Sequence, residues 1–317
     1  MVHTLEVRTW WQRTVILLAA LATAGSTGWA QTNGVAQGRT HAGTHWQHAI
    51  DQAASMAPEA RILVLEIGSG DLLASAHIVE ASRTLETPGS TLKPLILYYA
   101  LASQLWDPER RVTCSRKMHI GSHQLNCSHP AADPMNTEQA LTWSCNAYFA
   151  ELAGALTPEE LRKALSERNL LAATGLKAGE NVAYFHMPRT REQIQLVALG
   201  VEGIRVTLTE LAEAYRSLAI ELAAHPESVA TRTVRVGLSE SASFGMADAA
   251  AFGGVPIAGK TGTASAESGG TTHGWFVGLA PAESPQVVVA VYIPVGHGSD
   301  AALVAASVLA HSPLRKP

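Results

Sequence analysis

The sequence predicts an α+β fold, in which an antiparallel sheet of about five strands is flanked by helices and adjoined by a mainly helical lobe. Two observations support this prediction. Strand-forming residues gather at both ends of the body of the chain, and residues 90–224 between them are mostly helical in pattern. The predicted strands are residues 61–67, 72–78, 255–264, 274–279 and 286–294.

The first part of the body predicts a helix followed by a β-hairpin. Apolar residues recur at helical spacing at Trp46, Ile50 and Ala53, which indicates a helix. Residues 68–71 have the sequence GSGD, which is typical of a tight turn. The first two strands flank this turn, so we expect them to pair.

The last part of the body predicts paired strands and a closing helix. Residues 280–285, APAESP, form a short connection between the last two strands, which suits antiparallel neighbours. An apolar helix is expected over residues 299–310. We expect the functional site in the cleft between the sheet and the helical lobe.

The N-terminus has the features of a secretory signal peptide. Arg8 and Arg13 precede an apolar run over residues 14–25, and small residues follow at Gly28 and Ala30. The run is shorter than the roughly 20 apolar residues that a membrane-spanning helix needs, although an uncleaved segment would tether the chain to a membrane.

This pattern predicts three regions. Residues 1–30 are the expected signal peptide, residues 31–43 a flexible leader, and residues 44–317 the functional domain. The expected location is therefore the periplasm or another compartment outside the cytoplasm.

Composition argues against a nucleic-acid partner. The chain carries 23 basic and 27 acidic residues, and its formal net charge is −4. Proteins that bind phosphate backbones concentrate lysine and arginine in a block or patch, and no such block occurs in the sequence. The hydrophobic fraction of 47% is instead that of a chain with a substantial core.

The three cysteines leave several interpretations open. Cys114 and Cys127 lie in one loop-like stretch, where a small disulfide loop is the favoured interpretation for an oxidising compartment, and Cys145 is left over. Unpaired thiols are the second interpretation. A metal site with the nearby histidines is the third, but the spacing C-x₄-H-x₃-H-x₃-C-x-H matches no established zinc pattern. We therefore expect no metal at these residues. The histidines concerned are His119, His123 and His129.

The first motif is Ser90-Thr91-Leu92-Lys93. If a helix begins near Ser90, Lys93 lies one turn further on the same face, within reach of the hydroxyl. A serine needs such a base to become a nucleophile, and a helix N-terminus favours a developing oxyanion. The pattern S-x-x-K is common by chance, and alone it also fits a loop serine followed by a surface lysine.

The second motif is Ser144-Cys145-Asn146. The serine hydroxyl could relay a proton, and the asparagine amide can both accept from and donate to a peptide bond. A serine that starts an ordinary helix explains the same residues.

The third motif is Lys260-Thr261-Gly262-Thr263, on a predicted strand. Lys260 and Thr261 offer a cation and a hydroxyl to a carboxylate. Gly262 lacks a side chain, so an extended substrate could lie against the strand. A strand-terminal turn with a solvated lysine is the alternative.

The order S-x-x-K, S-x-N, K-T-G resembles the signature of the penicillin-binding protein transpeptidase domain, within the serine β-lactamase and D,D-peptidase superfamily. The resemblance runs from about Arg61 to the C-terminus. Residues 62–74 look like the opening hairpin of these domains, residues 198–215 like a late helix, and residues 273–281 like the strand after K-T-G.

The resemblance implies a β-lactamase/transpeptidase-like fold and a serine D,D-peptidase that acts on peptidoglycan stem peptides and is acylated by β-lactams. Ser90 would be the nucleophile, Lys93 its base and Ser144 a proton shuttle, and no metal or cofactor would be required. It further implies that backbone N–H groups of Ser90 and Thr263 form the oxyanion hole. The substrate would be bound by Asn146, Lys260, Thr261, Gly262 and Thr263.

Two other functions remain open at the level of sequence. A serine β-lactamase would need a carboxylate that activates water, yet Glu159, Glu160 and Glu180 lack the E-x-x-L-N context of one large class. A non-catalytic penicillin sensor or binding scaffold would need only the fold. The sequence does not separate transpeptidation from carboxypeptidation.

Overall fold

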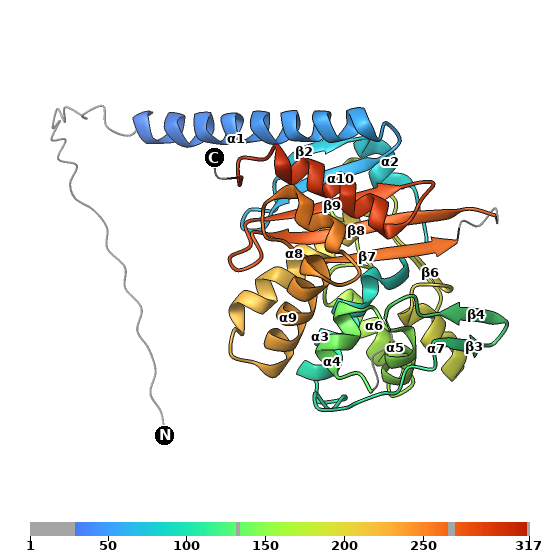
Figure 1. The fold of residues 1–317 in the computed structure, drawn as a ribbon. Coiled ribbons are helices and arrows are strands. Elements are labelled where there is room, and N and C mark those ends of the chain that lie inside the picture. The colour runs from blue at the N-terminus through green and yellow to red at the C-terminus, as the bar shows by residue number, and fades with distance from the viewer. Residues whose placement is uncertain (1–28, 131–133, 266–269, 316–317) are drawn as a thin grey trace, which may run out of the picture. The chain divides into compact units, whose positions relative to one another are not determined.

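A computed structural model describes residues 29–130, 134–265 and 270–315 (Figure 1). The chain divides into two compact units, residues 1–39 and residues 40–317, and the second contains the sheet and the helical lobe. Nearly all of the predicted signal peptide lies outside the described residues. Helix α1 (Trp29–Met56) passes through residues 31–43, for which the flexible leader stays a prediction. No proline interrupts this segment, and a helix can therefore continue through it.

The predicted antiparallel sheet of five strands is present. Its order is β2-β1-β9-β8-β7, and each neighbouring pair is antiparallel. The two N-terminal strands form one hairpin and β8 pairs with β9 across the short connection, as the sequence predicts. The bounds are β1 (Arg61–Glu66), β2 (Leu72–Ala76), β7 (Ala258–Ser265), β8 (Thr272–Ala280) and β9 (Val287–Ile293).

The sheet is covered on both faces, because alternate residues of its strands point to two separate hydrophobic cores. Val289 and Val291 pack with α10 (Gly298–Ala310) and with residues 46–53 of α1. Ala290 and Tyr292 belong to the other core, which includes α8 (Leu208–Ala224). The strand order places β7 at one edge of the sheet.

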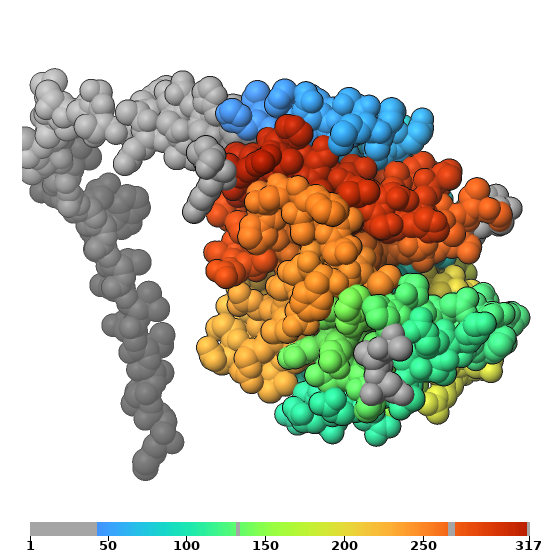
Figure 2. Space-filling view, in the orientation of Figure 1, coloured from blue at the N-terminus to red at the C-terminus, as the bar shows by residue number. Residues whose placement is uncertain are grey.

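The helical lobe is built from five helices and a small hairpin. The helices are α3 (Lys93–Ala102), α4 (Thr137–Thr142), α5 (Asn146–Ala153), α6 (Pro158–Ser166) and α7 (Arg191–Ala198), and the hairpin is β3 (Lys117–Ile120) with β4 (His123–Asn126). In Figure 2 the lobe (green) lies directly below the C-terminal elements (orange and red).

Further elements lie between the sheet and the lobe or beside them. Helix α9 (Val229–Ser243) packs on α3, α4 and β7, and the 3₁₀ helix η1 (Gly89–Leu92) packs on β7. The other elements are α2 (Ile78–Arg83), β5 (Tyr184–Phe185), β6 (Ile204–Arg205) and η2 (Asp248–Gly253). Among the described residues, no helix has both the length and the apolar character that crossing a bilayer requires.

Candidate active site

Ser90 lies in η1, at the junction between the sheet and the lobe. Gly89 precedes it with φ of 56°, a left-handed conformation that favours glycine. The backbone N–H of Lys93 donates to the carbonyl of Ser90, which closes one tight turn, and α3 starts at Lys93 with Pro94 in its first turn. The predicted helix start near Ser90 is therefore present, and the serine side chain is partly exposed.

Lys93 is fully buried and connects two of the three motifs. Its Nζ donates to Ser144 O at 2.8 Å, to Ser144 Oγ at 3.2 Å and to Asn146 Oδ1 at 2.7 Å. These three acceptors match the three protons of an ammonium group, and the predicted role of Lys93 as the base for Ser90 stays a prediction. Burial lowers the pKa of Lys93 from 10.5 to about 8.

The S-x-N motif forms the turn between α4 and α5. Ser144 has φ of 54°, an uncommon conformation for a residue with a side chain, and its carbonyl accepts from Lys93. Cys145 is the N-cap of α5 and Asn146 its first residue. The turn thus presents the Asn146 amide and the Ser144 hydroxyl to the same ammonium group.

The K-T-G motif lies on the edge strand β7. Lys260 is fully buried, and its Nζ donates to the carbonyl of Thr261 at 3.0 Å. Burial, together with the charge of Lys93, holds the pKa of Lys260 well below 10.5. The hydroxyl of the buried Thr261 donates to Met246 O at 3.1 Å, whereas the exposed Thr263 accepts from the N–H of Gly298 at 2.9 Å.

Glycines allow η1 and β7 to approach closely. A Cβ atom on Gly262 would lie 2.5 Å from Pro88 O, and one on Gly89 would lie 2.9 Å from Thr263 O and 3.1 Å from Thr263 N. Packing against η1 therefore requires the absence of a side chain at Gly262, and the interpretation of Gly262 as room for a substrate stays a prediction. The contact also places the backbone N–H groups of Ser90 and Thr263 on neighbouring segments.

Two supporting residues lie in the segment that resembles a late helix of the family, but the sequence assigns neither of them a role. The carbonyl of Gly200 accepts from Gly89 N at 3.0 Å, and a Cβ on Gly200 would lie 2.2 Å from Gly89 O. The hydroxyl of Tyr215, on α8, donates to Thr91 O at 2.8 Å. Both residues hold η1 in place, and only the fold brings them near it.

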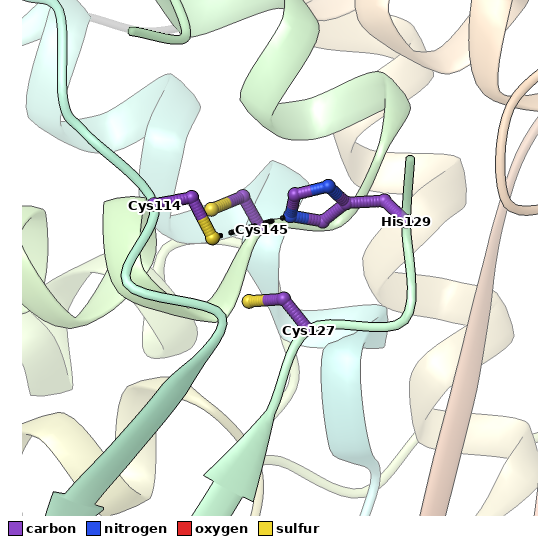
Figure 3. A group of neighbouring side chains, drawn as sticks. All are labelled: Cys114, Cys127, His129 and Cys145. Atoms are coloured by element: carbon purple, nitrogen blue, oxygen red, sulfur yellow. Dashed lines mark hydrogen bonds between the residues drawn. The ribbon is translucent and has the colours of Figure 1, made fainter. Parts of the chain in front are cut away.

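The cysteines do not form the predicted disulfide. Cys114, Cys127 and Cys145 are free thiols, and Figure 3 shows their sulfur atoms converging with the ring of His129. The stretch from Cys114 to Cys127, predicted as a loop, contains the β3–β4 hairpin, which brings its two ends back toward α5. His119 and His123, on β3 and β4, are not part of this cluster.

A comparison with known families identifies the domain. Residues 78–312 match the family described as penicillin binding protein transpeptidase domain. The chain is 28% identical over 234 residues to the probable peptidoglycan D,D-transpeptidase PbpC of Pseudomonas aeruginosa, covering 65% of this chain and 41% of that protein. It is 26% identical over 252 residues to the probable peptidoglycan D,D-transpeptidase PenA of Neisseria flavescens. This match covers 70% of this chain and 61% of that protein. The chain thus spans roughly half the length of these curated relatives.

Solved structures agree on the fold. The transpeptidase domain of penicillin-binding protein 3 from Burkholderia pseudomallei superposes with a TM-score of 0.74 at 22% identity, covering 84% of this chain and 93% of that one. A structure described as a peptidoglycan glycosyltransferase from Burkholderia ambifaria superposes with a TM-score of 0.73 at 20% identity. The superposition covers 86% of this chain and 94% of that one. The chain therefore belongs to the penicillin-binding protein transpeptidase family.

Proposed function

We propose that this protein is a serine D,D-peptidase that acts outside the cytoplasm on peptidoglycan stem peptides through an acyl-enzyme on Ser90. One observation carries the proposal. Lys93, one turn after Ser90, bonds to Ser144 and Asn146, while the K-T-G strand packs on the turn that holds Ser90. These contacts support a single site built from all three motifs.

The proposed reaction starts with neutral Lys93, which accepts the Ser90 proton as the oxygen attacks the carbonyl of the penultimate D-alanine. The N–H groups of Ser90 and Thr263 stabilise the oxyanion. The C–N bond then breaks as Ser144 passes its proton to the nitrogen of the leaving D-alanine, and protonated Lys93 returns a proton to Ser144. An acceptor amine or water finally attacks the ester, gives its proton to Lys93, and the Ser90 oxygen takes that proton as the ester bond breaks.

Substrate binding is proposed along the edge of β7, where an extended peptide can add main-chain hydrogen bonds. Asn146 would hold the amide bond, and Lys260 with Thr263 would bind the terminal carboxylate, while the Thr261 hydroxyl donates to Met246 O. A groove at the end of β7 offers room for the rest of the stem peptide. It is lined in part by Thr87, Tyr184, Glu202 and Ser265.

The test is labelling with a fluorescent penicillin, followed by incubation with a stem pentapeptide that ends in D-Ala-D-Ala. We expect one label per chain, lost in Ser90→Ala, and release of D-alanine. Adding an acceptor amine separates the two activities, since a transpeptidase forms the cross-linked product and a carboxypeptidase does not. Repeated nitrocefin turnover would favour a β-lactamase, and absence of any labelling would refute the enzyme.

A further inference from the structure

A cluster of three thiols and one imidazole lies behind the S-x-N motif. The Sγ atoms of Cys114, Cys127 and Cys145 and a ring nitrogen of His129 all lie within 4.8 Å of one another (Figure 3). Cys114 precedes β3, Cys127 follows β4, and Cys145 caps α5, so three separate segments contribute. Cys127, Cys145 and His129 are buried, and Cys114 is partly exposed.

The ring of His129 is oriented as a metal ligand would be. Its Nδ1 lies 2.7 Å from Pro130 O, and because a carbonyl only accepts, Nδ1 carries the proton. The neutral ring then has its lone pair on Nε2, which lies 3.4 Å from Cys114 Sγ. A backbone carbonyl that fixes the histidine tautomer in this way is a usual partner of metal-bound imidazoles.

We propose that Cys114, Cys127, Cys145 and His129 bind one zinc ion in a tetrahedral structural site. Zinc–sulfur bonds of about 2.3 Å and zinc–nitrogen bonds of about 2.0 Å would place ligand atoms roughly 3.5 to 3.8 Å apart, so the cluster needs little contraction. Three thiolates and an imidazole are typical of zinc, whereas magnesium and calcium prefer oxygen ligands. Binding would release the thiol protons to solvent.

The proposed ion would position the S-x-N motif. Asn146 is held to the hairpin by its backbone N–H, which donates to Cys127 Sγ at 3.2 Å, and by its Nδ2, which donates to Asn126 O at 2.9 Å. Its Oδ1 accepts from Lys93. A zinc ion bound to Cys127 and Cys145 would therefore fix the two residues that Lys93 contacts, because Cys145 lies between them in the chain and Cys127 accepts from Asn146.

The spacing of the ligands along the sequence does not reveal this site, because they do not form the two closely spaced ligand pairs of common zinc motifs. The β3–β4 hairpin folds back between Cys114 and Cys127, and Cys145 comes from the next helical segment. A disulfide between any two of the sulfurs is the competing state. It would remove two ligands at once, which makes the two states distinguishable by experiment.

The first test measures metal in the purified full-length chain. We expect about one zinc per chain by mass spectrometry. After chelation under reducing conditions, titration with Co²⁺ should produce the intense visible bands of tetrahedral cobalt and a near-ultraviolet sulfur-to-cobalt band. Zinc should abolish both. Counting thiols in the unfolded chain should give all three cysteines, and a count of one would show a disulfide and overturn the proposal.

Variants locate the site. Cys114→Ala and His129→Ala should each lower metal affinity by about 100-fold or more, since even the loss of outer partners costs about 10- to 100-fold. His129→Cys keeps a ligating atom and should retain the cobalt bands. The matched control is His119→Ala, an exposed histidine on the same hairpin, which should bind metal like the parent chain. Equal metal content in all variants would place the ion elsewhere and overturn the assignment.

The positioning role has a separate readout. Removing zinc from the parent chain should slow acylation by penicillin about 10- to 100-fold, and restoring zinc should recover it. The cobalt spectrum does not depend on catalysis. Metal binding without penicillin labelling would therefore refute the proposed enzyme alone, while an acylation rate unchanged by zinc removal would refute the positioning role.

Discussion

Lys93 is the residue whose chemistry depends most on its surroundings. Only the neutral amine can accept the Ser90 proton, and burial brings its pKa down to about 8. Acylation by penicillin should therefore accelerate as pH rises from about 7 to about 9, because the neutral fraction rises from roughly a tenth to roughly nine tenths. The measurement is the second-order acylation rate against pH. A rate independent of pH over this interval would contradict a basic role for Lys93.

The two threonines of the third motif should differ in function. The Thr263 hydroxyl accepts from Gly298 and keeps its own proton for a substrate carboxylate, whereas Thr261 already donates its proton to Met246 O. We expect Thr263→Val to slow acylation by about 10-fold or more, as for loss of a hydrogen bond to a charged group. Thr261→Val is the isosteric comparison and should act mainly on stability. A larger loss of acylation in Thr261→Val than in Thr263→Val would reverse this assignment.

At the scale of residues, the sequence predicts which residues belong to the candidate site better than it predicts their contacts. Ser90, Lys93 and Asn146 could be named because each belongs to a short string with its own chemical logic, and the structure brings the strings together. The partners of Lys93 could not be predicted, since they depend on the left-handed turn at Ser144. A metal site was only the third interpretation of the cysteines, because the convergence of His129 with the three thiols arises from chain folding and not from spacing.

At the scale of elements, the contact between η1 and β7 holds the site together. Gly262→Ala would place a Cβ 2.5 Å from Pro88 O, in backbone that cannot move away cheaply. We expect a loss of stability of about 1 to 3 kcal/mol, as for overpacking, and acylation at least about 10-fold slower. Urea unfolding and penicillin labelling measure the two effects.

The control for this substitution is Gly68→Ala, where an added Cβ meets nothing within 4 Å and φ is not positive. It should leave both measurements near those of the parent chain. If the two variants behave alike, close packing is not the reason for glycine at position 262.

The strands were predictable because β-branched runs and turn residues mark them, and β1, β2, β7, β8 and β9 lie within two to three residues of the predicted bounds. The β3–β4 hairpin was not predicted. Its signal was present, since Gly121-Ser122 separates two short segments and Gly121 has φ of 57°, but cysteines and histidines at its borders suggested a loop. Short, polar strands give weak periodicity, and their existence is decided by tertiary contacts.

At the scale of the whole molecule, one face of the sheet depends on the end of α1. Trp46, Ala49, Ile50 and Ala53 are at most 3% exposed and belong to the same core as β9 and α10. The domain should therefore begin near residue 44, where the sequence predicts it. A chain that starts at residue 44 keeps these side chains, whereas one that starts at residue 58 uncovers the sheet.

This difference predicts contrasting truncations. The chain 44–317 should unfold at the same urea concentration as the full-length chain and accept penicillin equally well. The chain 58–317 should lose more than about 3 kcal/mol of unfolding free energy, since deleting one buried large side chain already costs about 3 to 5 kcal/mol. Because that deficit is a large part of a typical domain stability of about 5 to 15 kcal/mol, much of the shorter chain should be unfolded or aggregated at physiological temperature. Equal stability of the two truncations would mean that residues 44–57 lie on the sheet without supporting it.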